Sequence, residues 1–324
     1  MDIQEVFSTY DKELTAVEDF LGEKYDSYVQ LIPEISNHII NSGGKRLRPL
    51  LLMISSDLCG YRGERRYALA ATIEFIHTAS LLHDDVIDHA NIRRGKMAAN
   101  RLWGNTASIL VGDYLYATAF RLLTEDGDSA VQQLVATATT TMVEGETLQF
   151  LKSGDVTITE EEYLAIIEKK TAILMSTACA MGAVLARAPE PTVSALYQFG
   201  MLIGTTFQVT DDTLDYVGAE ENFGKTIGMD LREGKMTLPL IHILKQCSDS
   251  ERASVSRIIE SKSAADDDIL EISSIISKYE GIEYAIKKAK ESVKEAKRLI
   301  ASFEDSIPKQ ALLTISDYIL QRKL

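Results

Sequence analysis

Three long stretches of the sequence, residues 70–82, 129–143 and 191–210, carry at most one charged side chain each. Alternating strand patterns bounded by Asn-Gly or Asp-Gly turns are missing from the chain. A helix that is apolar or weakly polar on all its faces is typically enclosed by other helices. We therefore predict an all-α fold, a single large helical bundle around a central cavity.

Several helix boundaries can be predicted from local signals. Capping boxes at Thr159–Glu162 and Ser248–Glu251 predict two helix starts, and Pro49 suits the first turn of a third helix. Residues 282–300 carry an apolar stripe with 4-3-4-3-4 spacing, which predicts an amphipathic surface helix. Because no repeat, low-complexity linker or βαβ pattern divides the chain, we expect a single domain over residues 1–324.

The composition limits the kinds of partner and compartment. Lys and Arg number 34 against 48 Asp and Glu, a formal net charge of −14, which argues against a nucleic-acid-coating protein. The three cysteines have neither CxxC nor CxH spacing, so we expect a reducing, cytoplasmic location without a zinc site. The N-terminus is acidic, unlike a secretory signal, and residues 191–210 contain Gln and Thr, so we expect no transmembrane segment.

Two aspartate clusters end two of the weakly charged stretches. Asp84, Asp85 and Asp88 form the first, and Asp211, Asp212 and Asp215 form the second. The outer members of each cluster are i,i+4 neighbours on a helix, where like charges repel, and negative charge opposes the dipole at a helix C-terminus. An acidic surface would explain one such cluster, but two copies favour bound cations. Sparse carboxylate ligands without the glycine of an EF-hand suit Mg²⁺ completed by substrate phosphate.

A diphosphate bound in this acidic chain needs local positive charge, and the sequence places basic residues near both clusters. Arg93 and Arg94 follow the first cluster, and Lys225 and Lys235 follow the second. Upstream, residues 43–49 set three cations beside two glycines at a predicted helix start, where backbone N–H groups also favour an anion.

With these motifs, the chain resembles the trans-polyprenyl diphosphate synthases, which lengthen an allylic diphosphate with isopentenyl diphosphate. The resemblance runs nearly end to end and is carried by GGKRLRP (43–49), EFIHTASLLHDDVID (74–88), RRGK (93–96), GNTASILVGDYL (104–115), GETLQ (145–149), KT (170–171), FQVTDDTLD (207–215) and GKTIGMDLREGKMTLPL (224–240).

The resemblance implies a role for each matching residue. Three Mg²⁺ ions per active site would be held by Asp84, Asp88 and Asp211, with Asp85, Asp212 and Asp215 giving indirect or water-mediated contacts. The allylic diphosphate would contact Arg93, Lys170, Lys225 and Lys235, and Thr171 and Gln208 would face the allylic cation. Isopentenyl diphosphate would bind to Gly44, Lys45, Arg48, His77 and Arg94. A lone histidine such as His77 is otherwise more often a satisfied core residue.

Small residues below the first cluster imply a long product. In the family, bulky aromatics four and five residues before the first aspartate stop chain growth, whereas this chain has Ser80 and Ala79 there. Thr72 and Ile76 continue the same face of the predicted tunnel. We therefore predict a product between hexaprenyl and decaprenyl diphosphate, most like that of octaprenyl diphosphate synthase, made from farnesyl diphosphate for quinone side chains. A shorter-chain geranylgeranyl diphosphate synthase is the alternative.

Three other readings compete with this one. A class I terpene cyclase shares the helical fold but has no need of GGKRLRP and usually replaces the second aspartate cluster. A non-catalytic subunit of a heteromeric synthase is disfavoured because both clusters are complete. A carrier of apolar ligands would not need six aspartates. The resemblance also implies a homodimer, and a poorly soluble product implies transient membrane contact for its release.

Overall fold

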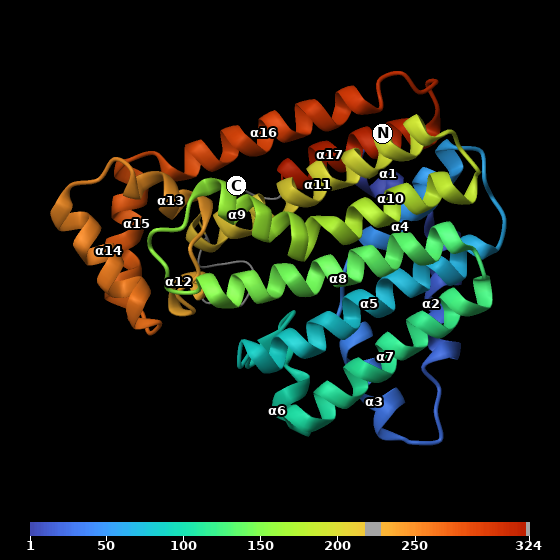
Figure 1. Cartoon of the computed structure of the whole chain (residues 1–324), viewed down its shortest axis with the longest axis horizontal. Helices are drawn as coiled ribbons and strands as arrows, with labels where there is room; N and C mark the ends of the chain where they lie inside the picture. The colour runs from blue at the N-terminus through green and yellow to red at the C-terminus, as the bar shows by residue number, and fades with distance from the viewer. Residues whose placement is uncertain (218–227, 322–324) are drawn as a thin grey trace. The chain divides into compact units, whose positions relative to one another are not determined.

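The computed structural model describes residues 1–217 and 228–321, and the regular secondary structure of these residues is almost entirely helical (Figure 1). The prediction of an all-α fold is confirmed. Contacts group the chain into two compact units, with boundaries inside helices α8, α11 and α17, at the start of α10 and between α16 and α17. Unit 1 comprises residues 1–139, 174–197 and 303–314, and unit 2 comprises 140–173, 198–302 and 315–324. The expectation of one domain over residues 1–324 stays a prediction.

Unit 1 is organised around the pairing of two long helices, α5 and α7, which run side by side in Figure 1. Thirteen residues of α5 are buried, and its core side chains Leu69, Phe75 and Leu82 are fully inaccessible to solvent. The elements that begin in this unit are α1 (Ile3–Thr9), α2 (Asp11–Lys24), α3 (Leu31–Ile40), α4 (Leu47–Leu58), α5 (Arg65–Ile87), β1 (Ile92–Arg93), β2 (Lys96–Met97), α6 (Ala99–Trp103), α7 (Asn105–Asp126), α8 (Ser129–Lys152), α11 (Glu190–Val217) and α17 (Ile307–Leu320).

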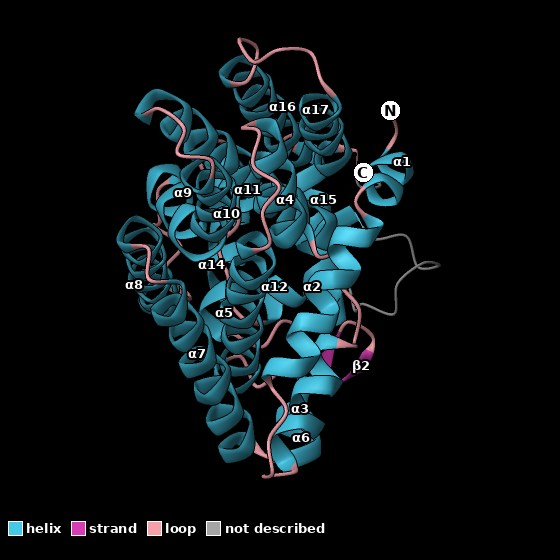
Figure 2. Cartoon of the chain, turned by 90° about the vertical axis from the view of Figure 1, so that its right-hand side faces the viewer, coloured by secondary structure: helices cyan, strands magenta, loops and turns pink. Residues whose placement is uncertain are grey.

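A two-stranded hairpin, magenta in Figure 2, is the β structure of the described residues. Ile92 pairs with Met97 and Arg93 with Lys96. Its turn residues, Arg94 and Gly95, both have positive φ, as a two-residue primed turn requires. The sequence did not predict this hairpin, because a strand of two residues is too short to show an alternating pattern.

Unit 2 packs shorter helices around a second core formed by Tyr163, Leu231, Leu240, Ile259 and Ile272. The elements that begin in it are α9 (Glu160–Ile167), the π-helix η1 (Glu168–Ala172), α10 (Ile173–Leu185), α12 (Met229–Arg232), α13 (Leu238–Leu244), α14 (Asp249–Ser261), α15 (Asp266–Lys278) and α16 (Gly281–Leu299).

The local helix signals hold in the structure. Thr159 and Ser248 each cap a helix through a complete capping box, and Pro49 lies in the first turn of α4. The predicted amphipathic helix is α16, which buries Ala289 and Val293. No helix among the described residues is long and apolar enough to span a membrane.

One prediction about the weakly charged stretches is wrong. Helix α8 is not enclosed on all sides within the described chain, because Ala136, Thr137 and Thr140 are exposed and Val143 keeps 61% of its surface accessible. The uncharged part of α8 therefore has one exposed face, and an exposed face without charged residues is unusual for a solvated helix.

Candidate active site

The first aspartate cluster lies at the C-terminal end of α5, where Asp88 is the C-cap residue. Asp84 and Asp88 are half-buried, whereas Asp85 is fully buried. Oδ1 of Asp85 accepts a hydrogen bond from Nε of Arg93 at 2.7 Å and forms an ion pair with Nη2 at 2.6 Å. Burial raises the pKa of Asp85, and the Arg93 guanidinium opposes that rise. The middle aspartate thus holds an arginine, and the outer two remain closer to solvent.

The hairpin brings further basic side chains to the loop between α3 and α4. Arg94 donates to the carbonyl of Gly43, and Nζ of Lys96 donates to the carbonyl of Asn41 at 3.1 Å. A Cβ on Gly44, which has φ of +144°, would lie 2.9 Å from Nη1 of Arg94. Glycine at position 44 therefore lets the guanidinium lie directly on the backbone.

Arg48 and His77 lie within this basic region. Burial lowers the pKa of Arg48 to about 10, with Glu74 opposing the shift and Arg94 adding to it. Burial also lowers the pKa of His77 well below its ordinary value, and the charges of Arg48 and Arg94 lower it further. The Nε atom of Arg48 is buried and has no hydrogen-bond partner among the described residues. A neutral imidazole and a cation with an unused donor together suit an anionic ligand.

Arg46 has a different role from its basic neighbours. Its guanidinium forms ion pairs with Glu74 at 2.9 Å and Glu18 at 3.3 Å, and donates to the carbonyl of Ile40 at 2.7 Å. It also adopts φ of +46° immediately before α4. Arg46 therefore fixes the loop that presents Lys45 and Arg48, and Lys45 is exposed.

The four residues of α5 that the sequence analysis predicted to line a tunnel differ in their access to solvent. Thr72, Ile76 and Ala79 are fully buried, whereas Ser80 is half-buried and donates to the carbonyl of His77. Ser80 is one turn before Asp84 and shares its face of the helix. Of the two positions that the sequence singled out, Ser80 is the more accessible.

The second aspartate cluster lies at the end of α11 in unit 2, and its middle member is again the buried one. Asp212 keeps 2% of its surface accessible and accepts three hydrogen bonds. Tyr163 donates to Oδ2 at 2.7 Å, while Gln208 and Lys235 donate to Oδ1 at 2.8 Å each. Burial alone would lower the pKa of Lys235, but Asp212 and Asp230 raise it well above its ordinary value.

The other two aspartates of this cluster are less constrained by side chains. The Asp211 side chain is half-buried and forms no hydrogen bond or ion pair with the residues that the structure describes. Asp215 accepts backbone N–H groups of Met229 and Asp230, at 3.3 and 3.0 Å. Burial raises the pKa of Asp230 to about 8, with Lys235 opposing the rise and the two nearby carboxylates adding to it.

Lys170 and Thr171 lie on η1, the one π-helical turn of the described chain. Nζ of Lys170 is 2.5 Å from a carboxylate oxygen of Glu146, and the Thr171 hydroxyl donates to Gln208 at 3.0 Å. Thr171, Gln208, Asp212 and Lys235 are therefore linked in one hydrogen-bonded chain. Lys225 lies outside the described residues.

Comparisons with known proteins identify the family. The family model for polyprenyl synthetase matches residues 29–276. The chain belongs to the polyprenyl synthetase family. It is 36% identical to octaprenyl diphosphate synthase of Haemophilus influenzae over 98% of this chain and 96% of that protein. It is 35% identical to geranylgeranyl diphosphate synthase of Sulfolobus acidocaldarius, covering 98% of this chain and 99% of that one.

A solved structure adds a ligand to this comparison. The polyprenyl synthase of Caulobacter crescentus complexed with calcium and isoprenyl diphosphate superposes with a TM-score of 0.95 at 35% identity, covering 100% of this chain and 98% of that one. Polyprenyl synthetases are Mg²⁺-dependent prenyltransferases that use isoprenyl diphosphate substrates.

The donor set of this polyprenyl synthetase fits a hard divalent cation. Within residues 1–217 and 228–321, no three His, Cys, Asp or Glu side chains form a ready-made metal cage. Mg²⁺ usually takes only one or two carboxylates from a protein and completes its shell with water and phosphate oxygens. Asp84 and Asp88 in unit 1, and Asp211 in unit 2, are each half-buried, whereas Asp85 and Asp212 are buried and form ion pairs with Arg93 and Lys235.

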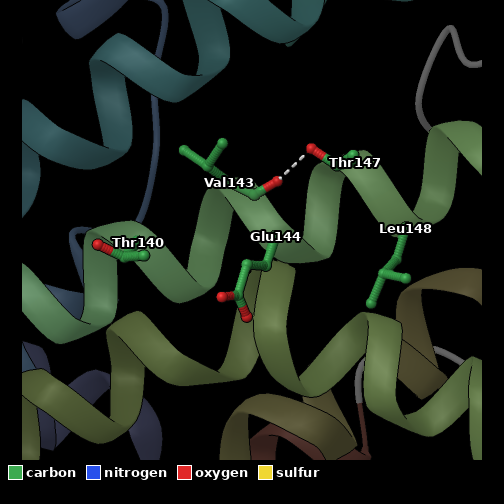
Figure 3. Close-up of a pocket in the computed structure, with 5 residues that line it drawn as sticks. All are labelled: Thr140, Val143, Glu144, Thr147 and Leu148. Carbon is green, nitrogen blue, oxygen red and sulfur yellow. Dashed lines mark hydrogen bonds between the residues drawn. The ribbon is translucent and has the colours of Figure 1, made fainter.

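Two surface pockets are lined by residues of the long helices α5, α7 and α8. A pocket of about 610 Å³ lies along α8 and is lined by Thr140, Val143, Glu144, Thr147 and Leu148 (Figure 3). A second, of about 250 Å³, is lined in unit 1 by residues of α5 and α7, namely His83, Val86, Ile87, Ile109 and Asp113. Both are largely apolar surfaces, the first on α8 and the second on α5 and α7.

Proposed function

We propose that this chain is a trans-prenyltransferase that adds isopentenyl diphosphate repeatedly to an allylic primer, with farnesyl diphosphate as the primer. The observation that carries the proposal is the basic site of Arg48, His77 and Arg94, which contains an unused buried donor and is built from the Gly43–Gly44 loop and the hairpin. An enzyme that cyclises a single diphosphate has no use for this second anion site.

The two substrates divide between the two sets of residues. We place isopentenyl diphosphate on Gly44, Lys45, Arg48, His77 and Arg94, and the allylic diphosphate on Arg93, Lys170, Lys225 and Lys235. Three Mg²⁺ ions, held by Asp84, Asp88 and Asp211, would neutralise charge on the departing diphosphate. Asp85 and Asp212 orient Arg93 and Lys235, and Asp215 orders the backbone at Asp230. Thr171 and Gln208 turn their oxygen atoms toward the carbon that becomes positive.

These residues act mainly through prepositioned charge. Breaking the allylic C–O bond places negative charge on the diphosphate, so cations fixed before the reaction stabilise the transition state more than the bound substrate. The neutral His77 can bind a diphosphate oxygen only by donating its ring N–H. Apolar residues exclude water that would capture the allylic cation.

We further propose an octaprenyl product, within the hexaprenyl-to-decaprenyl range, that serves quinone side chains. The small side chains at Ala79 and Ser80 support it, together with the identity to octaprenyl diphosphate synthase. The alternative is a shorter, geranylgeranyl product, because a geranylgeranyl diphosphate synthase is also among the relatives.

The working form of the enzyme is also part of the proposal. We propose a cytoplasmic homodimer that contacts membranes transiently to release product. The three cysteines are unpaired, which fits a reducing compartment. Ile109, Leu110 and Phe120 of α7 are exposed apolar residues and offer surface to a second copy. Sedimentation of the purified chain tests the dimer.

The function is tested by incubating the chain with farnesyl diphosphate, labelled isopentenyl diphosphate and Mg²⁺, then sizing the dephosphorylated alcohols. We expect products centred on octaprenol. Arg48→Gln should raise KM for isopentenyl diphosphate, whereas Arg65→Gln, which removes an exposed partner of Asp126, should not. A product that stops at geranylgeraniol establishes the shorter-chain alternative. If labelled isopentenyl diphosphate is incorporated only after a second protein is added, the chain is a subunit of a heteromeric synthase.

A further inference from the structure

The π-helix η1 is a short irregular segment within an otherwise α-helical run from α9 through α10. The amide of Ile173 donates to the carbonyl of Glu168, five residues earlier, which defines the π turn. π turns are rare and often mark functional positions, because they change the direction of the side chains that they carry. Here those side chains include Lys170 and Thr171.

Helix α8 approaches η1 so closely that only glycine fits at position 145. A Cβ built on Gly145 would lie 2.5 Å from the Lys170 amide nitrogen and 2.8 Å from the Lys169 Cβ. The residues on either side of Gly145 form ion pairs with the same two lysines: Glu144 with Lys169 and Glu146 with Lys170, each at 2.5 Å. Glu144 extends from α8 toward the neighbouring helix in Figure 3.

Helix α11 makes an equally close approach to the end of η1. A Cβ built on Gly204 would lie 2.5 Å from the Cα of Ala172 and 2.7 Å from its Cβ. One turn later on α11, Gln208 accepts the hydrogen bond of Thr171. Two glycines from different helices therefore meet the backbone of the π turn, and both clashes involve main-chain or Cβ atoms that cannot rotate away.

We propose that Gly145 and Gly204 are positioning residues that hold η1 and so place Lys170 and Thr171 for prenyl transfer. The inference rests on the proposed function of those two residues. To bring a 2.5 Å approach to the 3.4 Å of ordinary contact, a Cβ at either glycine must displace η1 by roughly 1 Å. A displacement of about that size is enough to cost about 10²-fold in rate when it misplaces a reacting group.

The test is a double-mutant cycle measured by kinetics. Gly145→Ala should lower kcat by about 10²-fold and leave KM for isopentenyl diphosphate within about twofold of the wild type. In the Lys170→Ala background, the same change should add less than about threefold, because the group that it misplaces is already gone. Gly204→Ala should show the same coupling to a Thr171→Val change.

Gly182→Ala is the matched control. A Cβ there would lie 2.5 Å from the Ser56 amide nitrogen, so the steric conflict is equal but does not involve η1. Its folded fraction should fall to a similar degree while kcat per folded molecule is kept. If Gly145→Ala does not fold, Glu146→Gln, which keeps the volume, takes its place in the cycle with an expected loss of about fivefold.

If the kcat loss of Gly145→Ala or Glu146→Gln simply multiplies that of Lys170→Ala in the double variant, the inference is overturned. An equal loss of kcat in Gly182→Ala would overturn it as well. Inactivity of the wild-type chain would instead refute the proposed function.

Discussion

The hydroxyl of Tyr163 provides a sharp test of how the second aspartate cluster is held. It donates to Oδ2 of Asp212 at 2.7 Å, and both side chains are almost completely inaccessible to solvent. Tyr163→Phe removes this donor and keeps the ring that packs in the core of unit 2. Oδ1 still receives Gln208 and Lys235, but Oδ2 is left buried without its donor.

The magnitude follows from the charge on the acceptor. Hydrogen bonds to charged groups contribute roughly 1.5–3 kcal/mol, and a buried oxygen that loses its donor cannot regain one from water. We therefore expect the free energy of unfolding to fall by about 2 kcal/mol, measured by urea denaturation at neutral pH. Because Asp212 also orients Lys235 and Gln208, kcat should fall by about tenfold.

Tyr284→Phe is the control for this prediction. Tyr284 also donates to a carboxylate at 2.7 Å, but its acceptor Glu160 is nearer the surface and is shared with Lys288 at 2.8 Å. The control should lose under about 1 kcal/mol and keep full activity. Equal losses of stability in the two variants, or an unchanged kcat in Tyr163→Phe, would show that the hydrogen bond does not organise the site.

Three further predictions concern unit 1. Asp84→Ala should lower kcat by about 10³-fold or more, because it removes an expected metal ligand, and near-normal turnover would mean that the cluster does not bind metal. Ala79→Tyr should shorten the product to about geranylgeranyl length. Ser80→Phe should have the same effect at less cost in stability, because Ser80 is only half-buried. An unchanged product length on a reversed-phase plate would refute the tunnel. Arg48→Lys should rescue little of the Arg48→Gln defect in isopentenyl diphosphate binding, because a lysine lacks the forked donors of a guanidinium, and full rescue would show that only charge matters.

Local signals in the sequence were enough to predict the all-α class and the positions of several helix ends. A capping box depends only on the side chains of Thr159 and Glu162 and the backbone between them. The helix start can therefore be predicted from residues that are three positions apart. The same holds for the aspartates, whose i,i+4 spacing places them on one face of α5 or α11. Resemblance then supplied roles, and the structure groups the expected isopentenyl diphosphate residues in unit 1.

Features that depend on distant residues could not be read in this way. Tyr163 and Asp212 are 49 residues apart, and nothing near Tyr163 in the sequence distinguishes it from an ordinary core aromatic. Gly145 and Gly204 needed the π turn, which no propensity predicts. The sequence did not predict the exposure of α8, because the absence of charged residues suggests a buried face but does not identify what buries it.

The two aspartate clusters solve the same electrostatic problem in the same way. In each, three carboxylates within five residues would repel one another if all were charged and unpaired. In each, the middle carboxylate is buried and paired with a cation from a later segment, Arg93 for Asp85 and Lys235 for Asp212. Because each ion pair lies within one unit, we expect the middle aspartates to hold these cations and not to bind metal directly. Under the proposed function, the repeated DDxxD pattern would hold positive charge beside accessible carboxylates, which is what a site for a metal-bound diphosphate requires.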